Sequence, residues 1–362
     1  MSDVTDLQNA KGSYSSLQSN YGEFRGPAVK FKIDGSEVTS YPVLHLSLFN
    51  SIERADSFNL ELSGIYDYTK KAYNGKDKFK LGKAIDIDLG YVDKFSTVFH
   101  GYITSLKYEA NGEDDIKLII SGMDKTFKMT KGIKSRSFVK KKHSDIVSTL
   151  AGEAGLTPVV DSTTTTYEVI EQIGVTDYNF VQIMAEKNNY EAFVSGNKLY
   201  FRKLHKSTSP AVTLAWTEGL LGFSREDDLA DQPGEVTVRG WDPQKKEAVV
   251  GTCSSTTNVG TGSSGKSLLD QLVGGVKEYY YSEVKSQADA KTQAEAIFSR
   301  RAMKLVSARI TSVGIPELRA GTYVKIQGLD TDMNDTYYII SARHEIDESG
   351  YTTTLTVGSN VV

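Results

Sequence analysis

The sequence predicts a mainly β protein of the α+β class, in which a small α/β unit is inserted between two β-rich regions. Three observations support this prediction. Short runs of alternating apolar and polar residues fill most of the 362-residue chain, Asn-Gly and Asp-Gly pairs separate several of these runs, and helical periodicity is confined to a few segments. The chain also contains 20 Tyr and 31 Gly but only 7 Pro, which suits strands joined by glycine turns.

Residues 1–26 are rich in Ser, Asn and Gln and have few apolar anchors. We therefore expect a flexible N-terminal arm, which either frays or wraps around a partner. From 27 to 128 the alternation predicts short antiparallel strands that form a barrel or a sandwich, with turns at Asp34-Gly35, Asn74-Gly75 and Asn111-Gly112. The expected strands span 29–33, 43–49, 58–62, 85–89, 99–106 and 116–120.

Helical signals appear between residues 129 and 205. Ser144 is expected to cap a helix that runs toward Gly155, whose missing Cβ suits the left-handed position after a helix. Thr176 or Asp177 begins a second helix, and a pair of strands follows it. These strands are expected at 191–194 and 198–202. The segment 129–205 is therefore predicted to be a small α/β unit.

The second β-rich region covers residues 206–362 and contains one long helix, expected at 286–306. Ser286 and Asp289 form a capping box, in which the hydroxyl and the carboxylate each accept a hydrogen bond from a free backbone N–H. Before this helix, the Gly-, Ser- and Thr-rich residues 251–267 are typical of a flexible linker. The expected strands are 212–216, 235–241, 323–327, 337–346 and 351–357.

Composition excludes several classes of protein. The 42 Lys and Arg against 46 Asp and Glu give a formal net charge of -4, so the chain has no global basic field for nucleic acid or membranes. The single cysteine, Cys253, cannot form an intramolecular disulfide, and the 5 His lack metal-ligand spacing. The N-terminus is acidic and no apolar run approaches about 20 residues, so we expect cytosolic synthesis without stable membrane insertion.

The most specific motif is Gly260 to Ser267, a full match to the phosphate-binding loop of P-loop NTPases. In such a loop the backbone N–H groups and a lysine, here Lys266, bind phosphates at the start of a helix. A true P-loop follows a buried parallel strand, whereas Cys253 to Val259 is polar. We interpret the segment as a linker, and a nucleotide hydrolase that uses Lys266 remains the alternative.

Two further motifs resemble metal sites. Asp330, Asp332 and Asn334 begin like a calcium loop, but Asp335 stands where that loop needs glycine, so we predict a hairpin turn. His344-Glu345 resembles the start of a zinc-protease helix, but the second histidine position is Glu348, so we predict a strand. No metal site and no cofactor site is expected.

Paired carboxylates and the cysteine are the remaining catalytic candidates. Asp86 and Asp88 share one face of a predicted strand, and residues 226–228 lie in an acidic loop, but acid–base catalysis needs carboxylates that converge on a cleft. We interpret both groups as solvated. Cys253 lies in the predicted linker, where a nucleophile would lack an oriented base. We therefore predict a protein without catalytic residues.

A basic patch stands out on this acidic chain. Its members are Lys125, Lys128, Lys131, Lys134, Arg136, Lys140, Lys141 and Lys142. Only Phe127 and Phe138 are interleaved with them, whereas nucleic-acid binding favours regular aromatic stacking partners. The interpretations are a solvated face, docking onto an acidic protein partner, and nucleic-acid binding; we expect no nucleic-acid recognition.

The order of several motifs resembles phage late control protein D and the VgrG-type baseplate hubs. Phe99 to Ser105 is similar to their F-x-G-x-I/V strand, and 137–150 to their segment that ends in D-I-V-x-x-L. Residues 172–187 resemble Q-x-x-x-S/T-D-x-x-F-L/V-x-x-L-A/E-E, with Met184 in place of the leucine, and Tyr190 begins the hairpin that follows it. In the C-terminal half the similar segments are 290–301, 318–324 and 337–344.

The resemblance implies two β-barrel domains, at 27–128 and 206–362, around the α/β domain at 129–205. It further implies a non-enzymatic baseplate hub of a contractile tail or injection system, assembled in the bacterial cytoplasm. Its homotrimeric ring would join the hexameric tail tube, or a tube-initiator protein, to a central spike. Because this chain ends at Val362, the spike is expected to be a separate polypeptide. Tape-measure and other baseplate proteins are further candidate partners, and a carbohydrate-binding adhesin is a second alternative function.

Overall fold

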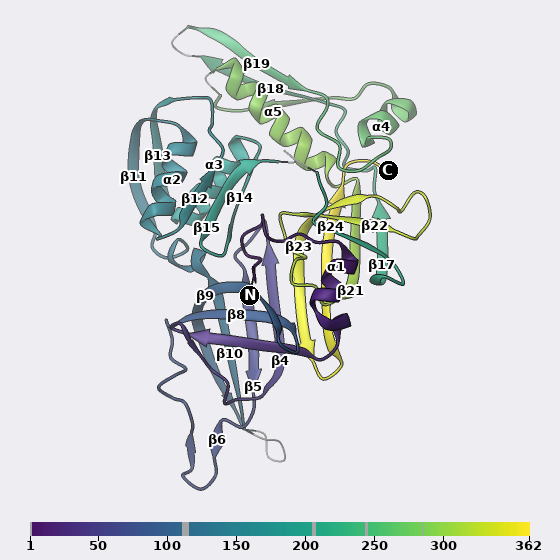
Figure 1. Cartoon of the computed structure of the whole chain (residues 1–362). Helices are drawn as coiled ribbons and strands as arrows, with labels where there is room; N and C mark the ends of the chain where they lie inside the picture. The colour runs from purple at the N-terminus through teal and green to yellow at the C-terminus, as the bar shows by residue number, and fades with distance from the viewer. Residues whose placement is uncertain (1, 111–115, 205–207, 243–244, 285) are drawn as a thin grey trace.

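The computed structural model describes residues 2–110, 116–204, 208–242, 245–284 and 286–362. Within these ranges most strands join one 14-stranded sheet that runs through both halves of the chain (Figure 1). The predicted mainly β fold class is confirmed. The turn expected at Asn111-Gly112 lies outside the described residues.

The first half is a strongly curved antiparallel sheet. Its spatial strand order is β4-β5-β10-β9-β8-β2, and a short β3 extends the β2 edge. Leu48, Ile85 and Ile120 are buried on its inner face, as expected for strands that alternate between core and solvent. The strands are β2 (Pro27–Ile33), β3 (Ser36–Glu37), β4 (Val43–Ser51), β5 (Ser57–Leu62), β8 (Ala84–Tyr91), β9 (Lys94–Glu109) and β10 (Lys117–Asp124), with a small β6 (Tyr66–Asp67) and β7 (Ala72–Tyr73) hairpin at one end.

The second half contains a closed six-stranded barrel. Its order is β17-β21-β24-β23-β22-β16, and β16 pairs with β17 to complete the ring. Leu214, Ile310 and Leu355 fill its interior. The strands are β16 (Val212–Trp216), β17 (Gly219–Asp227), β21 (Val306–Val313), β22 (Tyr323–Gln327), β23 (Thr336–Asp347) and β24 (Gly350–Ser359).

The two halves share one topology. If the six main strands of each half are lettered A to F along the chain, both halves have the spatial order B-C-F-E-D-A. They differ at the A–B seam, because β16 pairs with β17 in the second half, whereas β2 and β4 share no ladder in the described residues of the first. The halves are joined where β4 pairs with β23, from Leu46↔Ile346 to Ser51↔Ser341.

The α/β unit contains two helices that pack over a three-stranded sheet and a two-stranded ladder. Ile146, Leu150, Phe180 and Phe201 form its core. Thr176 caps the second helix, since its Oγ1 accepts a hydrogen bond from Asn179 N at 3.2 Å. The elements are η2 (Lys125–Lys128), β11 (Lys134–Lys141), α2 (His143–Glu153), β12 (Thr157–Val160), β13 (Tyr167–Val175), α3 (Asp177–Lys187), β14 (Tyr190–Ser195) and β15 (Lys198–Lys203).

The cap predicted at Ser144 differs from the observed helix start. Helix α2 already begins at His143, and the Asp145 carboxylate accepts a hydrogen bond from Lys142 N at 3.2 Å. Ser144 therefore lies in the first turn, where it is buried. The other end agrees with the sequence, because Gly155 has a φ of 75° just after the helix.

Residues 235–302 form a separate layer and are not part of the second barrel, which the domain prediction did not foresee. Three strands make a small sheet that α5 covers (Figure 1). Val236, Val238, Ala294 and Phe298 are buried between sheet and helix. The elements are β18 (Glu235–Asp242), β19 (Glu247–Cys253), α4 (Gly265–Val273), β20 (Lys277–Tyr281) and α5 (Gln287–Ala302).

Half of the predicted capping box of α5 is present. The Ser286 hydroxyl accepts a hydrogen bond from Asp289 N at 3.1 Å. The Asp289 carboxylate instead accepts hydrogen bonds from Thr165 (2.9 Å) and Tyr167 (3.1 Å), which belong to the α/β unit. The helix start therefore fastens the 235–302 layer to that unit.

The expectation of a flexible arm at 1–26 was wrong for the described residues 2–26. Strand β1 (Ser2–Asp3) pairs with β9, and α1 (Tyr14–Asn20) is followed by the short η1 (Gly22–Phe24). Val4, Leu17 and Tyr21 are buried against the main core. These apolar residues are few and irregularly spaced, so no helical or strand period revealed them.

Candidate functional site

The residues 317–321, between β21 and β22, lie where the second barrel meets the first sheet, the α/β unit and the N-terminal segment. Arg319 is only 2% exposed. Its guanidinium donates to Val98 O of the first sheet at 2.7 Å and to Ser195 Oγ of the α/β unit at 3.3 Å, and it lies 3.5 Å from the Asp56 carboxylate. One side chain of the second barrel thus contacts both other units.

The acidic partners of Arg319 are themselves linked and buried. Asp56 N donates to Asp124 Oδ2, and Asp56 Oδ1 accepts from Ser51 N, both at 3.0 Å. Burial and the neighbouring charge of Asp124 raise the pKa of Asp56 well above its ordinary value, and burial also raises the pKa of Asp124. Burial lowers the pKa of Arg319. The cluster is a desolvated charge group whose members depend on one another.

A second buried group joins the α/β unit to the barrel. Arg202 pairs with Glu191 at 2.6 Å and donates to Gly321 O at 2.5 Å, and the Tyr338 hydroxyl donates to Glu191. Gly321 has a φ of 82°, and a Cβ there would lie 2.7 Å from the Phe193 ring. Glycine is therefore required at the point where the two units touch.

The N-terminal segment packs across the same junction. Its Tyr21 hydroxyl donates to Glu317 Oε1 at 2.8 Å, and its Thr5 carbonyl accepts from Ser195 Oγ at 2.7 Å. His100 lies 3.3 Å from Asp3 and 2.6 Å from Asp86. Burial opposes protonation of His100, but the hydrogen bonds to Asp3 and Asp86 outweigh it and raise its pKa to about 9. The segment is thus held by charge as well as by apolar contacts.

The P-loop-like segment has its polar groups engaged within the protein. Thr261 N donates to Asp335 Oδ2 at 2.8 Å, and Ser263 N donates to Val362 O at 2.7 Å. Lys266 pairs with Asp270 one turn further along α4. A polar loop, not a strand, precedes this helix. The segment is also more ordered than the predicted flexible linker, because Val259 is fully buried.

The calcium-like residues form a turn. Met333 N and Asn334 N both donate to Asp330 O, at 2.9 and 3.1 Å, and the Asn334 side chain closes the loop on Leu329. Asp335 accepts from Thr261, as described above, and so connects this turn to the P-loop-like segment. In the part of the chain that the structure describes, no group of three His, Cys, Asp or Glu residues could hold a metal ion.

The other catalytic candidates are the paired carboxylates and the cysteine, and three of the carboxylates pair with basic side chains. Asp86 contacts His100, while Asp88 is buried and pairs with Lys32 at 3.3 Å, so these two carboxylates have separate partners. Asp227, in the acidic segment 226–228, pairs with Arg225 at 2.6 Å. Cys253 is a buried free thiol, and burial raises its pKa.

His344 lies inside strand β23 and not in a zinc-protease helix. Its Nδ1 is 2.9 Å from the Tyr351 hydroxyl and 3.1 Å from the Thr353 hydroxyl, and burial lowers the pKa of the imidazole to about 3. The histidine is therefore a neutral core residue. His205 lies outside the described residues.

The basic patch is partly neutralised within the α/β unit. Lys134 and Arg136 both pair with Asp177, and Arg136 also pairs with Glu153 at 2.9 Å. Lys140 and Lys141 are exposed on β11. The positive charge available to a partner is therefore smaller than the sequence indicates.

Sequence reasoning missed the charge cluster at the junction. Arg319 stands in the motif 318–324, but nothing in that pattern distinguishes a buried arginine from a solvated one. The available signal was one charge placed between apolar Leu318 and Ala320, after buried Ile315. Asp56 and Asp124 carry no such signal, because Asp56 directly precedes β5 and Asp124 ends β10, where a solvated aspartate is equally ordinary.

This fold, with its paired β units and inserted α/β unit, is that of phage tail proteins and VgrG-type proteins. The prophage MuSo2 43 kDa tail protein of Shewanella oneidensis superimposes with a TM-score of 0.70 at 16% identity, over 92% of this chain and 98% of that one. A tail protein of Neisseria meningitidis gives 0.68 at 15% identity, over 92% and 96%. A component of the E. coli type VI secretion system gives 0.57 at 13%, over 91% and 76%.

The chain belongs to the family described as the Alg8 N-terminal domain, whose model matches residues 26–348. No curated protein matches it at the level of sequence. Every helix in the described ranges is too short or too polar to cross a bilayer.

Proposed function

We propose that this protein is a structural hub of a phage-tail or injection-system baseplate, of the late control protein D or VgrG type. The observation that carries the proposal is the shared B-C-F-E-D-A topology of two β units fused side by side in one chain. Three copies around an axis would present six similar β units. On one face of such a ring, the six similar β units could contact the six subunits of a tail tube. On the other face, the ring has threefold symmetry, which suits a trimeric spike.

The interactions at the junction support a mechanical role. Arg319, Arg202 and Tyr21 each connect different parts of the molecule through buried polar contacts. Buried polar groups of this kind fix one relative arrangement, which a part that transmits force needs. In this proposal the protein has no enzymatic activity, and its partners are two further copies, the tube or tube-initiator protein, a spike protein and other baseplate proteins. It assembles in the bacterial cytoplasm and remains in the baseplate.

Co-expression with the tube and spike proteins of the same gene cluster tests the proposal. We expect light scattering of the purified complex to give a mass that contains three copies of this chain. The chain expressed alone is the control, since trimerisation can depend on the partners. A complex with a single copy, or the absence of any complex with either partner, would refute the hub function.

A further inference from the structure

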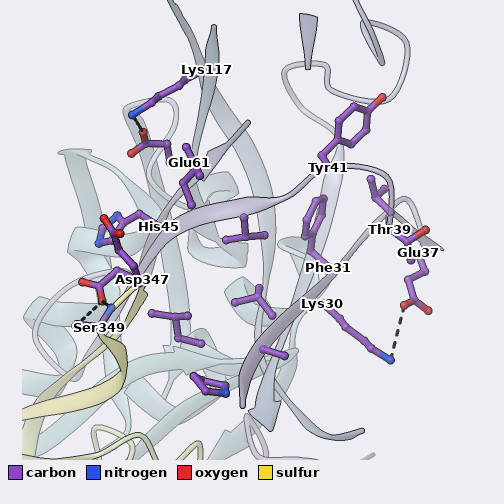
Figure 2. Close-up of a pocket in the computed structure, with 18 residues that line it drawn as sticks. Lys30, Phe31, Glu37, Thr39, Tyr41, His45, Glu61, Lys117, Asp347 and Ser349 are labelled. Carbon is purple, nitrogen blue, oxygen red and sulfur yellow. Dashed lines mark hydrogen bonds and ion pairs between the residues drawn. The ribbon is translucent and has the colours of Figure 1, made fainter. Parts of the chain in front are cut away.

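A large groove lies at the open seam of the first β unit. It has a volume of about 890 Å³ and runs between β2 and β4, beside the turn that joins β23 to β24 (Figure 2). Phe31, Tyr41, Val43 and Leu44 supply apolar lining, and charged residues surround it.

One wall of the groove is the first part of β2, residues 27–29, whose outer edge is unpaired because β3 covers that edge only from Phe31 onward. Val92 N donates to Gly26 O and Asp34 N donates to Ala84 O, so the even-numbered residues of β2 direct their backbone groups toward β8. Alternate residues of an antiparallel strand point to opposite sides. The backbone groups of Val29 and Phe31 therefore point away from β8. Phe31 O accepts from Val38 N, and β3 pairs with Lys32 and Ile33, so in the described residues the outward-facing N–H and C=O of Val29 have neither β8 nor β3 as a partner.

The opposite wall is an unpaired edge of β4. Strand β23 pairs with β4 only as far as Leu46, because β23 turns into β24 after Asp347. The first residues of β4, from Val43 to His45, thus have β5 on one side and the groove on the other. Leu44 is 38% exposed there. Two short unpaired stretches of strand edge, at 27–29 of β2 and 43–45 of β4, thus face one cavity.

In the described residues of the second half, the corresponding seam is closed. There, strands β16 and β17 pair through Ala215↔Gly219 and Trp216↔Leu220 and close the barrel. Open edges readily pair with other chains, and proteins usually cover them. The groove has a short open edge of β2 on one side and of β4 on the other, and a strand placed between them would also cover its apolar lining.

We propose that an extended segment of another polypeptide chain inserts between β2 and β4 and completes the first barrel by β-strand addition. The strands between β2 and β4 alternate in direction, so β2 and β4 run antiparallel to each other. The added strand must then run antiparallel to one edge and parallel to the other. This proposal does not depend on the hub function or on trimer formation.

Charge at the rim indicates the chemistry of the segment. Lys30 pairs with Glu37 at 3.9 Å and Lys117 with Glu61 at 2.9 Å (Figure 2). Asp347 and Glu348 also line the groove and take part in no ion pair within the described ranges. The rim is therefore net acidic by two charges, that is, four carboxylates against two lysines. The segment that fits best alternates apolar and polar side chains and carries Lys or Arg near one end.

Selection of random linear peptides of about 10 residues, the length of a long strand, against the full-length protein tests this inference. We expect enriched peptides with alternating apolar residues and at least one basic residue. Leu44→Lys places a positive charge in the groove and should weaken their binding by about tenfold or more. Leu81→Lys is the matched control, because Leu81 is 65% exposed and does not line the groove.

A second variant tests the backbone contact itself. Val29→Pro removes an N–H that β8 does not use, and proline is tolerated on edge strands. We expect the folded protein to retain its melting temperature within a few degrees and to lose peptide binding. Enrichment of no peptide, or binding that neither variant weakens, would overturn the proposal. A dimer of the isolated chain that Leu44→Lys dissociates would also overturn it, since a second copy would then fill the groove.

Discussion

The Arg319 guanidinium lies 3.5 Å from the Asp56 carboxylate, and both side chains are buried where the first sheet, the α/β unit and the second barrel meet. The pair is not a surface contact that water can replace. Removing one partner should strongly lower the free energy of unfolding, because the other partner would then be a buried charge without a counter-charge.

We predict that Arg319→Ala lowers the free energy of unfolding by about 3–5 kcal/mol, because it leaves Asp56 and Asp124 desolvated without a cation. Urea unfolding followed by fluorescence measures the change. Arg309→Ala is the control, since Arg309 is exposed and should change stability by no more than about 0.5 kcal/mol. A loss below about 1 kcal/mol for Arg319→Ala would mean that the cluster relaxes or takes up water.

The attachment of the N-terminal segment should depend on pH. The pKa of His100 is about 9 in the folded protein against an ordinary 6.5, so the folded state holds this proton more tightly. The stabilisation is complete below pH 6.5 and is lost as the pH rises through about 9. The expected decrease is about 3 kcal/mol, because the pKa rises from 6.5 to about 9 and each pKa unit corresponds to about 1.4 kcal/mol.

Unfolding measured between pH 6 and pH 10 checks this slope. His100→Gln removes the titrating group, so the free energy of unfolding of this variant should fall less between pH 6 and pH 10 than that of the wild type. The variant should also be cleaved faster by proteases near residues 2–6, already at neutral pH. If wild type and His100→Gln have parallel pH profiles, His100 does not contribute as described.

Lys266→Ala tests the remaining enzyme alternative. Lys266 is paired with Asp270 and the loop N–H groups of Thr261 and Ser263 already have acceptors, so we expect no ATP turnover in wild type or variant. Loss of a partly exposed pair within one helix should cost no more than about 0.5 kcal/mol. ATP turnover that Lys266→Ala abolishes would instead support a nucleotide hydrolase.

Gly321→Ala should destabilise the protein by about 1–3 kcal/mol, because its positive φ and the nearby Phe193 ring both oppose a Cβ. Gly152→Ala is the control, since the same substitution is expected to stabilise the protein at this position. Gly152 lies in α2 with open space around its Cβ position, so alanine should stabilise the helix by about 0.5–1 kcal/mol. Thermal unfolding of the two variants side by side measures both. Equal effects would show that backbone conformation at Gly321 is not limiting.

The sequence predicted local structure well wherever the signal is itself local. Thr176 and Gly155 mark helix boundaries because each satisfies or permits a backbone conformation within a few residues. Partnerships between distant strands carry no such signal. The strand at 235–241 alternates like any barrel strand, yet it joins β19 and β20 under α5, because burial against Phe298 depends on the whole assembly.

The candidate site was harder to predict for the same reason. Arg319, Asp56 and Asp124 are far apart in sequence, and each alone has the appearance of an ordinary surface charge. The basic patch was the reverse case, because its charge density was visible in sequence, whereas its neutralisation by Asp177 depends on the folding of α3 against β11.

The ladder between β4 and β23 gives the molecule a direction of mechanical strength. Six residue pairs connect the two β units, from Leu46↔Ile346 to Ser51↔Ser341. A pull along the strand axis loads all of these hydrogen bonds at once, whereas a pull across the sheet opens them one after another. The joint between the β units should therefore resist shear far better than peeling, and its resistance depends on which way the strands lie relative to an applied thrust.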